Sequence, residues 1–96
     1  MAMFTNFRYK NLPERQVQEI ITHCLTYSSN NEPHNFSMWH VGLTDDPNMS
    51  SLGDHFKLIS CDSNEEAADL KRYLTTLRRF GHDSEGEGKL IYIFRQ

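Results

Sequence analysis

The chain has 96 residues, 38% of them hydrophobic and 24% charged, which is the ordinary make-up of one globular domain with no room for a second core. Its net charge of −3 gives no general attraction to nucleic acid or to an anionic membrane, so any polyanion contact has to come from a local patch. No basic segment followed by an apolar run opens the chain, and its longest apolar stretch is too short to span a bilayer. We therefore expect a single cytoplasmic domain over residues 1–96 without a membrane segment.

The N-terminal third predicts one helix. Residues 1–10 carry three aromatic side chains with weak alternation, which favours an edge strand or an arm packed on the core. Asn11 and Pro13 then form a plausible helix start. Apolar residues recur at helical spacing from Val17 to Leu25, so we predict an amphipathic helix over about 12–28.

The middle of the chain changes to a period of two. Between residues 36 and 44, Trp39, Val41 and Leu43 share one face, which predicts a strand. A turn at 45–48 ends it, and residues 48–55 are expected to form a loop or a single helical turn. Residues 56–61 predict a second strand.

The C-terminal third predicts a helix and a final strand. Ser63 and Glu66 form a capping-box pattern before apolar residues at helical spacing, which indicates a helix over about 64–80, with Gly81 as its C-cap. Residues 89–95 are apolar on both faces, which suits a strand in a sheet with a helix on each face. The predicted fold class is α/β (α+β): a small, mainly antiparallel sheet of three or four strands flanked by two principal helices.

Cysteine and histidine spacing does not indicate a metal site. Cys24 and Cys61 are far apart in a chain without an export signal, so we expect two reduced, buried thiols. The five histidines show no CxxC, HxxxH or HExxH spacing, and His55 and His82 are expected to be exposed loop residues. The acidic glycine loop 83–88 opens like a calcium loop, but the required acid at its twelfth position would be Phe94. We predict no metal and no cofactor.

One stretch resembles a known family. The run Trp39-His40-Val41-Gly42-Leu43-Thr44-Asp45-Asp46-Pro47, here termed the signature segment, resembles the strand of small bacterial members of the GIY-YIG nuclease superfamily. The similarity continues in pattern through residue 96, whereas residues 1–35 play no part in it. The resemblance implies a GIY-YIG-like fold and phosphodiester hydrolysis by tyrosines, an arginine and a metal-binding glutamate.

The residues that the resemblance implies for catalysis are largely replaced. His40 stands where the family has a tyrosine, and Asn48-Met49-Ser50 stands where the family arginine would follow Pro47. The expected glutamate corresponds to Lys71, and a protonated lysine repels a divalent metal. A slipped alignment would instead bring Asp69 to the metal position. The resemblance thus implies a degenerate nuclease without catalytic residues.

We therefore expect a non-catalytic binding module that contacts protein or nucleic acid. If strand and helix pack as in the superfamily, Trp39, His40 and Thr44 meet Lys71 and Arg72 in one cleft that favours an anionic partner. A basic stripe, which Arg78 and Arg79 complete on the same helix, suits phosphate contact, although bases near a helix end also complement its dipole.

Two alternatives remain open. The first is a metal-dependent nuclease that uses His40 as a substitute base, and the second is a structural or oligomerising protein.

Overall fold

The computed structural model describes residues 11–27, 36–49, 53–83 and 86–95. In chain order the elements are helix α2 (Glu14–Thr26), strands β1 (Trp39–Thr44) and β2 (Asp54–Ser60), helix α3 (Asn64–Leu77), and strands β3 (Gly81–His82) and β4 (Leu90–Arg95). The predicted order of helices and long strands is confirmed, with boundaries shifted by up to three residues. The prediction of an edge strand or arm at 1–10 lies outside the described residues.

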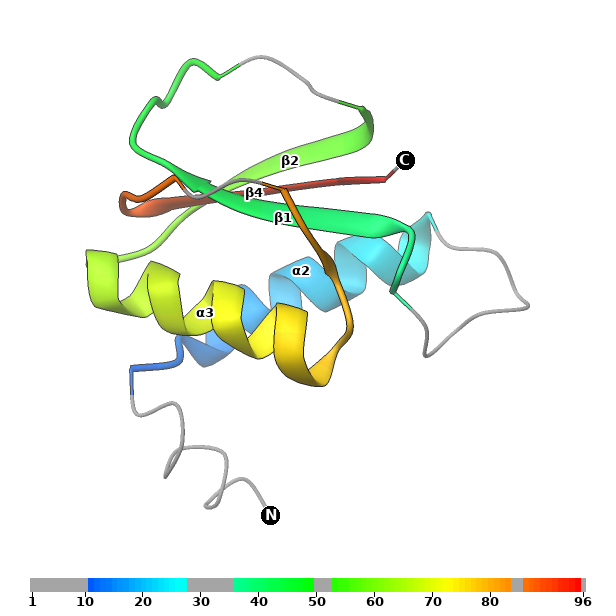
Figure 1. Cartoon of the computed structure of the whole chain (residues 1–96), viewed down its shortest axis with the longest axis horizontal. Helices are drawn as coiled ribbons and strands as arrows, with labels where there is room; N and C mark the ends of the chain where they lie inside the picture. The colour runs from blue at the N-terminus through cyan, green and yellow to red at the C-terminus, as the bar shows by residue number, and fades with distance from the viewer. Residues whose placement is uncertain (1–10, 28–35, 50–52, 84–85, 96) are drawn as a thin grey trace.

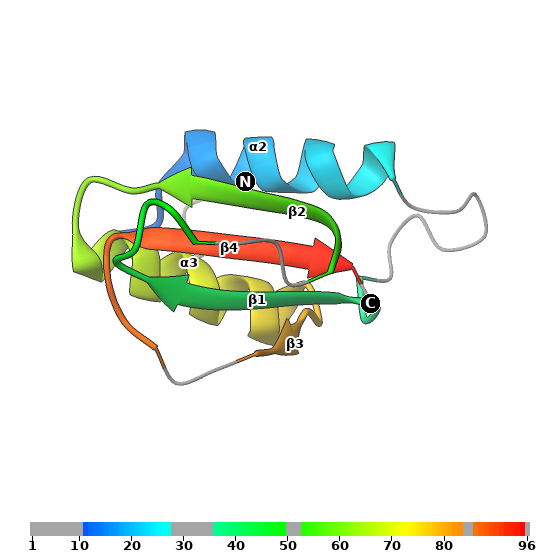
Figure 2. The same cartoon turned by 90° about the horizontal axis from the view of Figure 1, so that it is seen from above.

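The strands form one mixed sheet in the order β2-β4-β1-β3. Strand β4 lies between β2 and β1 and is antiparallel to both, whereas the two-residue strand β3 runs parallel to β1. Figure 2 shows this order from above, with β4 between β2 and β1. The α+β class with a mainly antiparallel sheet is therefore as predicted, and β3 is the strand too short for any sequence period to reveal.

Both helices lie on the same face of the sheet, which corrects the prediction of one helix on each face (Figures 1 and 2). Loops cover the other face instead. Tyr92 and Phe94 alternate with the core residues Ile91 and Ile93, yet they are only 2% and 3% exposed. Gly53 lies so close to Phe94 that an added Cβ would be 2.6 Å from a ring carbon. The second apolar face of β4 is thus covered by connecting segments rather than by a helix.

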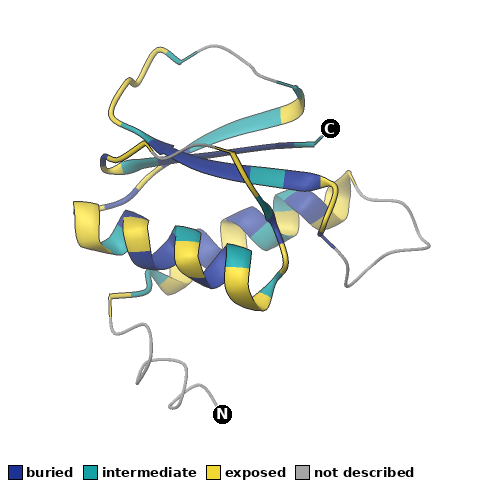
Figure 3. Cartoon of the chain, viewed as in Figure 1, coloured by how far each residue is buried: buried dark blue, intermediate teal, exposed yellow. Residues whose placement is uncertain are grey.

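The core fills the space between the sheet and the two helices, whose sheet-facing sides are buried in Figure 3. The spacing seen in the sequence produces this arrangement, because residues three or four apart share one side of a helix. Helix α2 contributes Val17, Ile20 and Cys24, while α3 contributes among others Leu70 and Leu74. No helix within the described ranges is long and apolar enough to cross a membrane.

The ends of α3 differ in how well the sequence predicts them. Ser63 Oγ accepts a hydrogen bond from the Glu66 N–H at 3.1 Å, as a capping box requires. The Glu66 carboxylate, however, accepts from the N–H of Asp62 at 3.1 Å. At the other end Gly81 is not the C-cap, because the left-handed residue is Arg79, with φ of 64°, and Gly81 already pairs with β1.

The start of α2 also differs from expectation. Pro13 is the N-cap residue, and its side chain makes no capping hydrogen bond. Asn11 instead uses its backbone N–H, which donates to Asp69 Oδ2 at 3.0 Å. This bond ties the segment before α2 to the side of α3.

Candidate functional site

The predicted site residues do not line a single surface. Trp39 is 1% exposed and lies in the core on the helix-facing side of β1. Side chains alternate along a strand, so His40 and Thr44 point to the opposite face of the sheet. Trp39 is therefore a core residue, and only the other two residues from the signature segment remain for ligand contact.

The two polar residues of β1 make specific local contacts. The half-buried His40 ring stacks on Phe94 with 5.4 Å between ring centroids. It also lies against Gly81, where an added Cβ would come within 2.5 Å of His40 Nδ1. Thr44 Oγ1 accepts a hydrogen bond from the Asp46 N–H at 3.1 Å, which closes the turn after β1.

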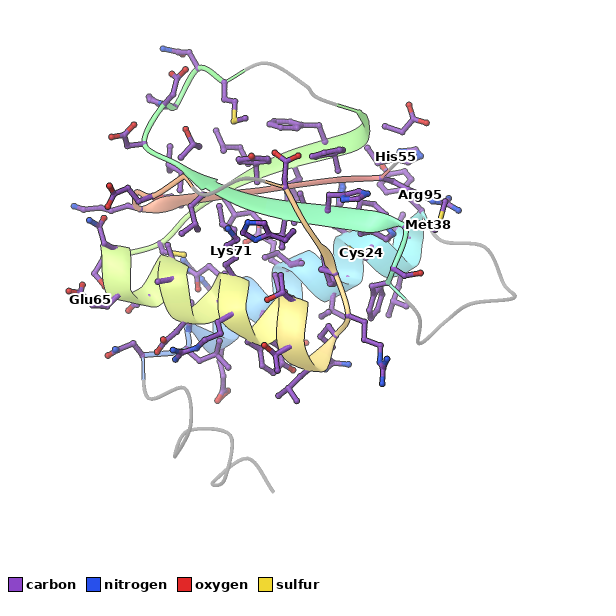
Figure 4. The ribbon with its side chains drawn as sticks, viewed as in Figure 1. Cys24, Met38, His55, Glu65, Lys71 and Arg95 are labelled. Atoms are coloured by element: carbon purple, nitrogen blue, oxygen red, sulfur yellow. The ribbon has the colours of Figure 1, made fainter. Side chains whose placement is uncertain are left out.

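The two predicted cations lie on α3 in different environments. Lys71 is half-buried, and in Figure 4 its side chain rises from α3 toward the sheet. Arg72 is exposed and donates to Asp69 Oδ1 at 2.8 Å, an ion pair within one helical turn. Because Asn11 bonds the other oxygen of Asp69, both oxygens of this carboxylate are engaged. Asp69, the alternative metal position, thus serves to fasten the segment before α2.

A cluster of aromatic and polar side chains that the sequence did not connect lies on the loop-covered face of the sheet. We term His40, Asp83, Tyr92 and Phe94 the front cluster. The Tyr92 side chain passes over Gly42 and donates its phenolic proton to Asp83 Oδ2. Asp83 is fixed in turn, because its N–H donates to the Val41 carbonyl at 3.0 Å. The phenol therefore connects β4, across β1, to the segment that follows β3.

Gly42 is the sequence signal that could have revealed this cluster. A glycine in a strand interior indicates a close approach by another group. An added Cβ at Gly42 would overlap the Tyr92 phenol. The pairing of Gly42 with Tyr92, however, depends on strand register, which the sequence did not specify.

A second group of residues that the sequence did not connect lies at one end of the sheet. The rings of Tyr27 and His55 stack at 4.1 Å with an interplanar angle of 13°. His23 Nε2 is 2.7 Å from the His55 carbonyl, and Arg95 Nη1 donates to the Tyr27 carbonyl at 2.9 Å. Figure 4 shows His55, Arg95 and Met38 together at this end. We term Tyr27, His55 and Arg95 the end platform; His55 is exposed, as predicted, but it belongs to β2 rather than to a loop.

Two grooves on the described surface bear on ligand binding. One, of about 570 Å³, follows α2. It is lined by Arg15, Gln18, Glu19, Thr22, His23, Thr26, Tyr27 and Lys57. The other, of about 470 Å³, lies beyond the signature segment and includes the acids Asp45 and Glu87 together with Lys89. The second groove is thus the less suited of the two to an anion.

Both thiols are buried and reduced, as predicted. Burial raises the pKa of Cys24 to about 12. Burial, reinforced by the negative charges of Glu66 and Asp62, raises the pKa of Cys61 to about 11. A thiol acts as a nucleophile or metal ligand only as thiolate, so neither cysteine is suited to that chemistry near neutral pH.

The described part of the chain contains no group of three or more His, Cys, Asp or Glu side chains that could hold a metal ion. No protein-family model, curated protein or solved structure matches the chain.

Proposed function

We propose that this chain is a non-catalytic binding module on a degenerate GIY-YIG-like scaffold, and that it contacts a nucleic acid or protein on both faces of the sheet, through Lys71 on the helix side and through His40 and Thr44 on the other. The observation that carries the proposal is Lys71, a half-buried cation at the position where the superfamily resemblance implies a metal-binding glutamate. A lysine at this position favours an anionic group on the partner and repels a divalent cation.

The state of Asp69 supports the non-catalytic part of the proposal. A slipped alignment would make this residue the metal ligand, but Arg72 and Asn11 bond its two oxygens. A metal would have to displace both partners. The arginine that would stabilise charge on a phosphate is also replaced, because Asn48 and Met49 follow Pro47.

The front cluster supports the binding part. His40 offers an imidazole edge on a rigid strand, held between Phe94 and Gly81. Polar groups held on a strand are better positioned for recognition than groups on a loop. Of the five residues expected from the sequence, Trp39 and Arg72 are left out, because one is buried and the other is ion-paired.

The test combines cleavage and binding in one assay. Labelled single- and double-stranded DNA and RNA are incubated with the protein in Mg²⁺ or Mn²⁺, and the products and mobility shifts are read from parallel gels. We expect intact nucleic acid, with any shift weakened by Lys71→Ala and unchanged by the control Lys89→Ala. Metal-dependent cleavage that His40→Ala abolishes would overturn the proposal and establish the nuclease alternative. A shift that is equal in both lysine variants would exclude Lys71 from the contact surface.

A further inference from the structure

We propose that the end platform is a second binding surface, distinct from the front cluster, and that it stacks bases of single-stranded nucleic acid while the groove along α2 holds the phosphate backbone. The proposal is independent of the function proposed above, since it concerns a different side of the domain. It rests on an exposed aromatic stack, its rigid support and the charges beside it.

The stack is placed for contact with solvent rather than for packing. Tyr27 is 42% exposed and His55 is also exposed, although their rings lie parallel at 4.1 Å. Exposed aromatic rings of this kind accept any base, because every base has a π-face. The stacked pair therefore leaves ring surface exposed at the end of the sheet.

The surrounding residues hold this surface rigid. His23 packs edge-on against both Tyr27, at 5.0 Å, and the buried Trp39, at 5.6 Å. Its Nε2 atom also bonds the carbonyl of His55, and Arg95 bonds the carbonyl of Tyr27. Both ring-bearing residues are thus fixed through their backbones, which lowers the entropy lost on binding.

A cationic track leads to the stack. The groove residues of α2 run from Arg15 to Tyr27 at helical spacing, a distance of about 18 Å at the rise of an α-helix. Arg15 and Lys57 line the groove and Arg95 lies at its end. Two acids lie beside these three cations: Glu19, which pairs with Lys57 at 3.5 Å, and Asp54, the β2 residue opposite Arg95. The local charge is therefore positive although the chain as a whole is negative, which suits a phosphate backbone.

An extended peptide is a poorer fit to the same groove. A peptide strand would bind by adding to the outer edge of β2. Side chains of α2 already occupy that edge: Gln16 donates to the Ser60 carbonyl at 3.2 Å, and His23 bonds the His55 carbonyl. The helix thus covers the edge against strand addition, and it leaves the groove itself open.

The experiment measures fluorescence anisotropy of a labelled oligodeoxythymidine of about 12 nucleotides, a length within the site sizes of single-strand binding folds. We expect Tyr27→Ala to weaken binding about tenfold or more, and Tyr27→Phe to retain it, because the ring supplies the stacking. The matched control is Leu77→Ala, another large exposed side chain on the other helix, which should leave the affinity unchanged. Arg15→Ala should remove about one phosphate contact and so lower the slope of log affinity against log salt concentration by about one.

A second variant keeps the test decisive if Tyr27→Ala fails to fold. Gln18→Glu places a negative charge on an exposed position of the groove and should weaken binding without a change in urea midpoint. Absence of binding at about 50 mM salt, equal affinities of Tyr27→Ala and Leu77→Ala, or a duplex bound as tightly as the single strand would each overturn the inference. Binding lost in Lys71→Ala but retained in Tyr27→Ala would also overturn it while leaving the proposed function in place.

Discussion

Replacing Gly42 with alanine tests whether the phenol of Tyr92 connects the strands as described. The added methyl group would overlap the phenol, which is 2% exposed and hydrogen-bonded to Asp83. Forcing an extra methyl into a packed site costs about 1–3 kcal/mol. Displacing the phenol also loses its bond to Asp83, worth about 1 kcal/mol here because the exposed carboxylate regains water. We therefore expect Gly42→Ala to lower the free energy of unfolding by about 2–4 kcal/mol.

The assay is urea unfolding followed by the fluorescence of Trp39, the single tryptophan, which is buried in the core. With a urea m-value of about 1–2 kcal/mol per molar, the midpoint should fall by about 1–4 M. A double-mutant cycle with Tyr92→Leu isolates the contact, because Gly42→Ala should cost much less once the phenol is gone. A Gly42→Ala cost that is the same in both backgrounds would refute the reasoning.

Four further outcomes follow from the structure. Ser63→Ala should lower the unfolding free energy by about 1 kcal/mol through loss of the α3 cap, whereas Ser63→Asp should retain most of it in the same urea assay. Because burial holds the pKa of Cys24 and Cys61 above the unfolded value of 9.0, stability should be complete below pH 9 and fall as pH rises toward 11–12, by about 1.4 kcal/mol per thiol at pH 10. The fall should shrink in the Cys24→Ala/Cys61→Ala variant, and an unchanged pH profile would contradict the assignment. Glu19→Gln should change the urea midpoint very little, since its ion pair is exposed. Analytical ultracentrifugation should give a mass that does not depend on concentration, whereas association would favour the oligomerising alternative.

The sequence predicts those parts of the fold where a local pattern determines burial. Ile91 and Ile93 alternate with Tyr92 and Phe94, and the structure places the two pairs on opposite faces of β4. The predicted C-cap of α3 was wrong because either Gly81 or a residue before it can adopt the left-handed conformation. Only the pairing of Gly81 with β1 decides between them. Strand β3 was not foreseen for the same reason, since two residues carry no period.

The prediction of one helix on each face of the sheet was wrong for a different reason. An apolar face of a strand requires cover, but its composition does not say whether a helix or a loop provides it. Here Gly53 brings a loop onto Phe94, and Asp83 brings another segment onto Tyr92. Both contacts join residues whose proximity follows only from the complete topology.

The candidate sites show the same limit. His40 was selected from the signature segment, but its neighbours Phe94 and Gly81 come from segments that local spacing cannot connect with it. Tyr27 and His55 were assigned respectively to a helix end and to a loop, and their stacking depends on how α2 packs against β2. Trp39 was included because it belongs to the signature segment, whereas its alternation with Val41 had already indicated a core position.

Helix α2 is part of the fold rather than an appendage to the segment that resembles the superfamily. Val17, Ile20 and Cys24 fill the core beneath the sheet, and Gln16 and His23 bond the outer edge of β2. The same helix that completes the core therefore covers an edge that would otherwise invite strand addition. Its last turn then places a tyrosine beside a histidine of β2. Because one helix performs both tasks, the binding that we propose for this end of the domain depends on residues outside the resemblance.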